Sequence, residues 1–300
     1  MSIRLLAVMV VSAILLGSAQ AATSTDKIII SGASGQLGQA TIKVLLERGV
    51  PARNLILVSR TPDTLSDLAK QGAAVRFGDF TQPDSLPAAF AGGTRMLLIS
   101  IGFGPLPRPE AHKNAIDAAV KAGVKQIAYT SFVAISKGET TGLAADHYQT
   151  EEILKKSGVK WTFLRNSIYM DGLVPQAAKA LIDGRVTLQP RETGKIGYVT
   201  RADCAAAAAA VLTTPGHENK AYDITGPELI GPREIAAAAT AATGKRVDVV
   251  LADSSAPAQA PRPFGGPALE VVSTAVADLT GHPATSLREL LVANRNKLPE

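Results

Sequence analysis

The stretch KIIISGASGQLG, residues 27–38, decides the fold of this chain. Lys27 to Ser31 is a short apolar run that predicts a buried strand. Gln36 to Glu47 then places apolar residues at helical spacing, which predicts an amphipathic helix. The glycines between these two segments therefore lie in a turn that joins a strand to a helix.

Three glycines in this turn each have a physical task. Gly32 permits a tight turn, Gly35 lets the backbone approach a pyrophosphate, and Gly38 lets helix and strand pack closely. The free amides at the start of the helix face the phosphates. A structural turn without a ligand is the alternative. The context predicts a dinucleotide site formed by Gly32, Ala33, Ser34, Gly35, Gln36 and Leu37.

The residue after the second predicted strand, Leu55 to Ser59, indicates which dinucleotide is bound. An acidic residue at this place would hold the ribose hydroxyls of NAD. The sequence has Arg60 instead, with no acid beside it. A guanidinium can bind the 2′-phosphate of NADP through paired hydrogen bonds, so the predicted cofactor is NADP, as NADPH. An ordinary surface arginine is the alternative.

Two further predicted strands end in cofactor candidates. Ala74 to Phe77 is followed by Asp79 and Phe80, where the acid can accept from the adenine amino group and the ring can flank the base. A turn-forming aspartate is a serious alternative. Arg95 to Ile101 contains Ser100, which faces the cofactor cleft by its position at the strand end.

The alternation of strands and helices continues to about residue 165, which predicts an α/β fold. We expect a Rossmann-type doubly wound parallel sheet as the NAD(P)-binding domain, residues 22–165. From residue 166 the pattern loosens into short strands and helices. Residues 166–300 are predicted to form a smaller α/β substrate-binding region packed on the same domain. Its Ser254 to Pro267 stretch, rich in proline, alanine and glycine, is predicted to be a surface loop or lid.

The amino terminus is separate from this fold. Arg4 precedes an apolar run that is too short for a confident membrane span, and Ala19-Gln20-Ala21 offers small residues for cleavage. We interpret residues 1–21 as a signal peptide, with no stable membrane span after cleavage. The protein is then exported or periplasmic, and otherwise cytoplasmic. Export would separate it from NADPH, which is a cytosolic metabolite.

Composition excludes several classes of function. The net charge is +5, but the basic residues are scattered among acids, so no nucleic-acid partner is expected. Cys204 is the single cysteine, which excludes an intramolecular disulfide and a cysteine-based metal site. No metal site is predicted, and the oligomeric state stays open.

Taken together, these residues resemble the NmrA-like atypical short-chain dehydrogenase/reductases, and most of all the type 2 NAD(P)H:quinone oxidoreductases. The resemblance covers nearly all of the chain after the leader, in order. The matching stretches are Ser31–Gly38, Ile127–Ser131, Ala145–His147 with Thr150–Glu151, Thr162–Asn166, Thr200–Asp203 and Tyr222–Gly226.

The resemblance implies NADPH on the glycine turn, with Arg60 on its 2′-phosphate. It also implies that the segment from Asn166, including Tyr169, borders the nicotinamide and a quinone-like substrate. This chain departs from the family at Ser167-Ile168, where Gly-Trp is usual, and at Ser100-Ile101-Gly102, where a serine run is usual. Both departures lie near the expected substrate pocket.

No tyrosine in the chain has a lysine four residues later, the pair that ordinary short-chain dehydrogenases use as general acid. Alcohol oxidation and sugar-nucleotide isomerisation would normally need that pair, whereas quinone reduction mainly needs the ring held over the nicotinamide. The candidate catalytic residues are Asn166 and Tyr169 as hydrogen-bond donors and His147 as a proton source, although a packing histidine is slightly favoured. Asp146, Thr150 and Glu151 are interpreted as helix capping and solvated charge.

Two functions therefore remain open. The first is an NADPH-dependent oxidoreductase that transfers hydride to a quinone or similar flat acceptor. The second is a non-catalytic NAD(P)-binding redox sensor or regulator of the NmrA type.

Overall fold

The computed structural model describes residues 26–102, 104–138, 140–188, 194–252 and 267–299. The predicted leader, residues 1–21, and residues 254–266 of the predicted lid lie outside the described residues. In the described part of the chain, no helix combines the length and the apolar character that a membrane crossing requires.

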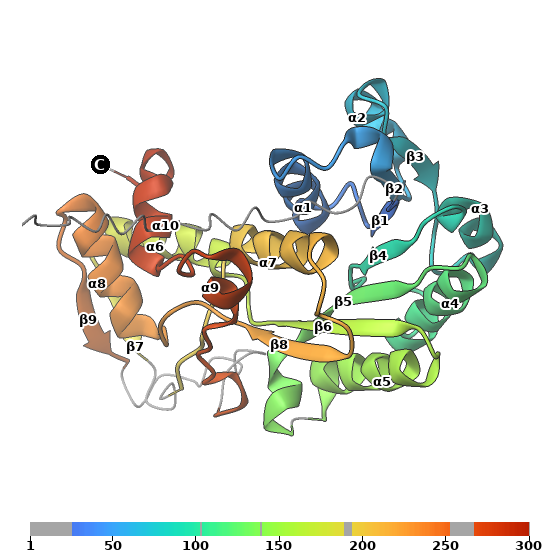
Figure 1. The fold of residues 1–300 in the computed structure, drawn as a ribbon. Coiled ribbons are helices and arrows are strands. Elements are labelled where there is room, and N and C mark those ends of the chain that lie inside the picture. Colours follow the sequence, from blue (N-terminus) through green and yellow to red (C-terminus); the bar gives the residue numbers. More distant parts are fainter. Residues whose placement is uncertain (1–25, 103, 139, 189–193, 253–266, 300) are drawn as a thin grey trace, which may run out of the picture.

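Seven parallel strands form one sheet in the order β3-β2-β1-β4-β5-β6-β8 (Figure 1). β1, β2 and β5 are buried along their whole length, as expected of parallel strands that are covered on both faces. The predicted Rossmann-type doubly wound sheet is confirmed. The strands are β1 (Ile28–Ser31), β2 (Leu55–Ser59), β3 (Ala74–Phe77), β4 (Arg95–Leu98), β5 (Gln126–Phe132), β6 (Lys160–Asn166) and β8 (Lys220–Ile224).

Helices cover both faces of the sheet and form a separate apolar core on each side. The alanine-rich α7 packs against α1 and is buried on almost all sides, which explains its lack of a polar face. One face carries α1 (Gln36–Glu47), α2 (Ser66–Lys70), α7 (Arg201–Thr213) and α9 (Ala275–Thr280). The other carries α3 (Leu86–Phe90), α4 (Arg108–Lys121) and α5 (Gly142–Lys156).

β4 ends at Leu98, three residues before the end of the predicted strand, because side-chain hydroxyls accept hydrogen bonds from the next two backbone amides. The Ile99 amide donates to Ser31 Oγ at 2.9 Å, and the Ser100 amide donates to Thr130 Oγ1 at 2.8 Å. β1 and β4 are neighbours whose connections leave toward opposite edges of the sheet. This is the switch point at which open α/β sheets form a ligand crevice.

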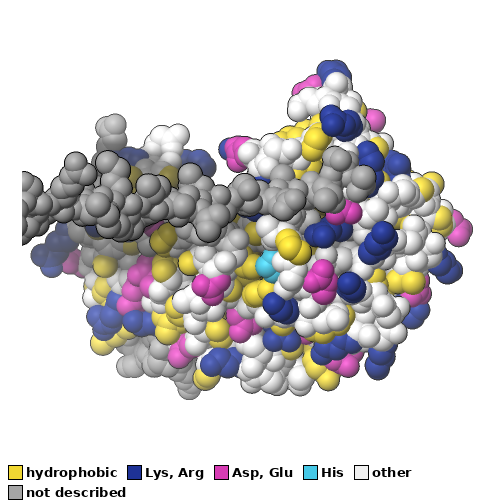
Figure 2. All heavy atoms as spheres, in the orientation of Figure 1, with side chains coloured by type: hydrophobic (Ala, Val, Ile, Leu, Met, Phe, Trp, Pro, Cys, Tyr) yellow, Lys and Arg dark blue, Asp and Glu magenta, His cyan; other side chains and the backbone are white. Residues whose placement is uncertain are grey.

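A smaller region with its own apolar core lies at one end of the molecule (Figure 1). It contains α6 (Leu173–Asp183), α8 (Pro232–Thr243), α10 (Leu287–Ala293) and a parallel pair of strands, β7 (Arg185–Leu188) and β9 (Asp248–Leu251). The main sheet crosses the boundary predicted at residue 165, since β8 pairs with β6. The functional division at that boundary stays a prediction. On the face shown in Figure 2, basic and acidic side chains are interspersed.

Candidate active site

A pocket of about 600 Å³ lies at the carboxyl ends of β1, β4, β5 and β6. This volume is within the range of small-molecule and cofactor sites. One wall is the glycine turn with the start of α1, and the opposite wall comes from β5 and α5. Its described lining includes Gly32, Gly35–Gly38, Ile99, Ser100, Thr130–Phe132, Leu143, His147, Asn166–Tyr169, Gly172 and Arg201.

The glycine turn has the geometry that its sequence predicts. Gly32 has a φ of +62°, in the left-handed region, and the Gly35 amide donates to the Gly32 carbonyl at 2.9 Å. A Cβ on Gly38 would lie 2.4 Å from the Gly32 carbonyl oxygen, so only glycine permits this approach of helix and strand. Gly35 precedes α1 without a side-chain cap, and α1 has no acidic residue in its first turn. Unpaired amides at a helix start suit an anion.

Ser34, within this turn, and Arg60, directly after β2, lie outside the pocket lining. The Ser34 hydroxyl is 2.7 Å from Ser59 Oγ and accepts from Thr61, which ties the turn to the end of β2. Thr61 thus bonds to the turn, and its side chain does not cap the short helical segment Pro62–Leu65 that follows. Arg60 is exposed, and no hydrogen bond or ion pair to another described residue engages its side chain. Its binding of the 2′-phosphate stays a prediction.

Asp79 and Phe80 have structural contacts of their own. Asp79 Oδ1 accepts from the amide and the hydroxyl of Thr81, at 2.9 and 2.8 Å, which is a turn-forming contact. The Phe80 ring is 6% exposed, belongs to the core on the α3–α5 side, and lies edge-on to His112. The core holds the ring in place, and its position beside an adenine stays a prediction. Asp79 stays a candidate.

Asn166, Ser167 and Tyr169 line the pocket after β6. Asn166 Oδ1 and Ser167 Oγ are fully buried and have no hydrogen-bond partner among the described residues. The Tyr169 hydroxyl is neutral at physiological pH, as tyrosines ordinarily are, and burial raises its pKa further. Both residues line the pocket, but these two oxygen atoms are themselves buried behind its surface, where an unpaired polar atom costs free energy.

His147 lines the opposite wall and is 6% exposed. Its Nδ1 is hydrogen-bonded to the Tyr129 hydroxyl at 2.8 Å. Burial, with the nearby Arg108 charge, lowers the pKa of His147 to about 3. The ring is therefore neutral at physiological pH. The prediction of His147 as a proton source stays untested, and in this setting it does not carry the imidazolium charge of a usual general acid.

Glu151 corrects one prediction from the sequence. Its side chain is 1% exposed and forms a paired salt bridge to Arg165, with distances of 3.0 and 2.9 Å. It also accepts from Ser131 Oγ at 2.6 Å. Glu151 is therefore a buried ion-pair residue and not a solvated charge, because its partner lies on β6, 14 residues further along the chain.

Thr150 and Asp146 are likewise more than helix-surface residues. Thr150 is fully buried, and its hydroxyl donates to the Asp146 carbonyl at 2.9 Å. The Asp146 carboxylate pairs with Arg108 at 2.7 Å.

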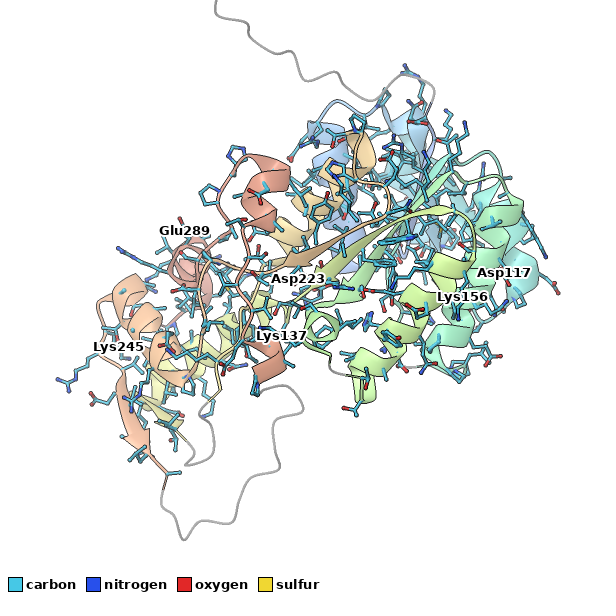
Figure 3. All side chains as sticks on the ribbon, turned by 60° about the horizontal axis from the view of Figure 1, so that its bottom comes forward. Asp117, Lys137, Lys156, Asp223, Lys245 and Glu289 are labelled. Carbon is cyan, nitrogen blue, oxygen red and sulfur yellow. The ribbon has the colours of Figure 1, made fainter. Side chains whose placement is uncertain are left out.

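Asp223 on β8, labelled near the centre of Figure 3, lies beside Arg165 and has one buried oxygen unpaired among the described residues. Burial raises the pKa of Asp223.

Several pocket residues were missed by sequence reasoning. Arg201 lines the pocket, lies 4.6 Å from the Tyr169 ring centre, and pairs with Asp171 at 3.4 Å. The Thr200–Asp203 motif was the signal that could have drawn attention to it. Cys204 is 2% exposed, and burial raises the pKa of its thiol. Within the described ranges, no cluster of metal-ligating side chains occurs.

Comparison with known proteins agrees with this geometry. A family model described as NAD(P)H-binding matches residues 32–215. The chain is 37% identical over 281 residues to Quinone oxidoreductase 2 of Escherichia coli (strain K12), covering 87% of this chain and 96% of that protein. Among solved structures, the NADPH complex of that E. coli quinone oxidoreductase has a TM-score of 0.76 at 34% identity, covering 90% of this chain and 99% of the other.

Citrobacter sp. triphenylmethane reductase, complexed with NADP(H), also has a TM-score of 0.76, at 32% identity, with 89% of this chain and 99% of the other covered. The family match spans well over half of the chain and includes the glycine turn. The chain therefore belongs to the NAD(P)H-binding, NmrA-like family.

Proposed function

We propose that this protein is an NADPH-dependent oxidoreductase that reduces a quinone or a similar flat acceptor. The observation that carries the proposal is a pocket lined both by the glycine turn and by the segment from Asn166 to Tyr169. Such a pocket has room for a nicotinamide and an acceptor ring in contact. The relatives named as quinone and dye reductases support the same chemistry.

The residues present fit the dinucleotide. The glycine turn, with Gly32 in the left-handed region and α1 starting at Gln36, offers backbone amides to the pyrophosphate. Arg60, exposed at the end of β2, would hold the 2′-phosphate. Asn166 and Ser167 line the pocket and would lie on the nicotinamide side. When bound, NADPH supplies a hydride, which with one proton from solvent converts a quinone to a hydroquinone.

The protein's own residues then position and shield the acceptor. Phe132, Leu143 and Ile168 give the pocket apolar surface that a flat ring can cover. Asn166 and Tyr169 are the proposed hydrogen-bond donors to an acceptor oxygen, and Tyr169 keeps its proton because burial raises its pKa. Neutral donors in a partly water-excluded pocket stabilise charge that develops on a carbonyl oxygen.

A redox sensor is the second candidate, and one observation favours it. The described lining holds no carboxylate and no lysine, and its histidine and tyrosine are both neutral. A pocket of this composition can bind NADPH without any side chain that readily gives up a proton at physiological pH.

One assay separates the two. The purified protein is mixed with NADPH and tetramethyl-1,4-benzoquinone (duroquinone) or other quinones, and loss of NADPH absorbance is followed. We expect protein-dependent oxidation that saturates with quinone, and a variant Asn166→Ala with lower turnover. An exposed-site variant, Arg53→Ala, is the matched control. Tight NADPH binding without turnover on any acceptor would support the sensor.

The compartment is part of this proposal. If the predicted leader, residues 1–21, is removed on export, the protein works away from cytosolic NADPH. Amino-terminal sequencing of the protein from fractionated cells tests this. A mature form that begins at Ala22 in an exported fraction would count against NADPH as the cofactor in the cell.

A further inference from the structure

Four polar side chains form a buried chain behind the pocket wall opposite the glycine turn. They are His112 on α4, Tyr129 on β5, and His147 and Thr150 on α5, and all are at most 6% exposed. Two hydroxyls and two imidazoles in such a site must share a small number of protons, so the direction of each hydrogen bond limits that of the next.

A backbone contact determines which ring nitrogen of His112 carries the proton. Its Nε2 accepts from the Ile101 backbone amide at 3.1 Å, and a backbone amide can only donate. Burial lowers the pKa of His112 to about 3, so the ring is neutral. Its one proton therefore lies on Nδ1, which is 3.0 Å from Thr150 Oγ1. Thr150 in turn donates to the Asp146 carbonyl and has lone pairs free to accept.

The Tyr129 proton follows from this. His112 Nδ1, 3.4 Å from the phenol oxygen, already carries a proton and cannot accept one. The Thr150 and Ser100 hydroxyls also lie near the phenol, but an imidazole nitrogen is the stronger acceptor. The phenol proton thus points to His147 Nδ1, 2.8 Å away. Burial raises the pKa of Tyr129, so the phenol keeps this proton.

His147 is left with its own proton on Nε2. The ring lines the pocket and lies stacked with Phe132 at 5.8 Å between ring centres. Nε2 has no hydrogen-bond partner among the described residues. Unlike the fully buried unpaired atoms of Asn166 and Ser167, it keeps some accessible surface, and we place that surface in the pocket that the ring lines. An N–H aimed into a ligand pocket, with its tautomer held from behind, is a prepared hydrogen-bond donor.

We propose that neutral His147 donates an Nε2–H hydrogen bond to the carbonyl oxygen of the acceptor, and that Tyr129 is the positioning residue that holds this tautomer. The inference rests on the proposed function and names the group that recognises the acceptor. The hydrogen bond is not a proton transfer: the donor holds the oxygen while charge develops there, and solvent supplies the proton afterwards.

The charged groups around His147 are compatible with this role. Arg108 is paired with Asp146, which is one residue before His147 on α5. Glu151, one helical turn further on, is paired with Arg165. Neither carboxylate is available to hold an imidazolium, so the ring stays neutral across the physiological range.

The test is NMR spectroscopy of the full protein with ¹⁵N-labelled histidine, in complex with NADP⁺, which cannot reduce a quinone. We expect the His147 proton on Nε2, and a shift of that resonance when duroquinone is added. Tyr129→Phe should allow a mixture of both tautomers, whereas Tyr148→Phe, at an exposed neighbour on α5, should leave His147 unchanged. A His147 proton on Nδ1, or an Nε2–H resonance that duroquinone leaves unmoved, would overturn the proposal.

Turnover gives an independent readout. With NADPH and duroquinone, His147→Ala should lower kcat about 100-fold. His147→Gln, which keeps an N–H donor, should recover part of that loss, and Tyr129→Phe should lower kcat with little change in NADPH affinity. Equal activity of the wild type and His147→Ala would also overturn the role of His147. If the wild type shows no turnover, the proposed function fails, while the NMR result still decides the tautomer and the quinone contact.

Discussion

The two walls of the pocket are built in different ways. The wall formed by the glycine turn and α1 offers backbone amides and close approach, and a Cβ on Gly38 would lie 2.4 Å from the Gly32 carbonyl oxygen. The wall formed by β5 and α5 offers side chains. His147 lines the pocket, Tyr129 and His112 follow it in a buried hydrogen-bonded chain, and Glu151 on α5 is paired with Arg165.

This difference separates recognition of the cofactor from recognition of the acceptor. A backbone wall binds the constant part of a dinucleotide, which every reaction of the family shares. In a side-chain wall, single substitutions can change which acceptor is recognised without disturbing cofactor binding. Substitutions in the two walls should therefore give separable effects.

The largest effect is expected for Glu151→Gln in the side-chain wall. Removing one charge leaves Arg165 without its buried partner, which should lower the free energy of unfolding by about 3 kcal/mol. Urea unfolding measures this. Glu152→Gln, the neighbouring and far more exposed carboxylate, is the matched control and should change stability by less than about 0.5 kcal/mol. Similar losses in both variants would contradict the buried pair.

Next in size is Gly38→Ala in the backbone wall. The added Cβ would force α1 away from the Gly32 carbonyl. By the usual cost of overpacking, we expect the free energy of unfolding to fall by about 2 kcal/mol and NADPH binding to weaken about tenfold. Gly102→Ala, where an added Cβ meets nothing within 4 Å, is the control. Fluorescence titration with NADPH gives the affinity, and unchanged binding would show that the turn does not hold the cofactor.

Acid should destabilise the side-chain wall. The pKa values of His112 and His147 are lowered to about 3 in the folded protein, against about 6.5 in an unfolded chain. Below pH 6.5 the unfolded chain binds protons that the folded protein excludes, so stability falls as the pH falls from about 6.5 toward 3. Each histidine should cost about 1.4 kcal/mol between pH 8 and pH 5.5.

Urea unfolding at the two pH values checks this. His147→Gln should reduce the pH dependence by the share of one histidine. His282→Gln, at an exposed position, should leave it unchanged. A wild-type stability that does not fall between pH 8 and pH 5.5 would show that these rings are charged in the folded protein.

The smallest effect is expected for Arg60. Its exposed side chain would hold the 2′-phosphate in contact with solvent, so Arg60→Ala should reduce the preference for NADPH over NADH about fivefold, or about 1 kcal/mol. Arg53→Ala, at the opposite end of β2, should leave the preference intact. An unchanged preference in Arg60→Ala would assign the 2′-phosphate to another residue.

The backbone wall was predictable because its signal is local. β1, the turn and α1 occupy residues 28–47, and hydrophobic periodicity with three glycines determines their arrangement. The parallel sheet covered on both faces followed from the alternation of strands with helices. β4 was predicted three residues too long, since the hydroxyls of Ser31 and Thr130 that end it lie on other strands.

The side-chain wall was only partly predictable, because its contacts join distant segments. His147 and Asn166 were chosen as candidates, yet Tyr129 and His112 were not, since no spacing in the sequence shows that α4, β5 and α5 meet behind the pocket. The expectation of a solvated Glu151 failed for the same reason: its partner, Arg165, comes from β6. Phe80 suits a base by type, but it packs in the core beside His112.

A crystal structure of the protein with NADP⁺ and duroquinone tests the central claim most directly. We predict the pyrophosphate on the amides of the glycine turn and a quinone oxygen within hydrogen-bonding distance of His147 Nε2. A dinucleotide bound away from the turn would contradict the claim. So would a quinone held elsewhere, such as in the smaller pocket between Gly102 and Arg108.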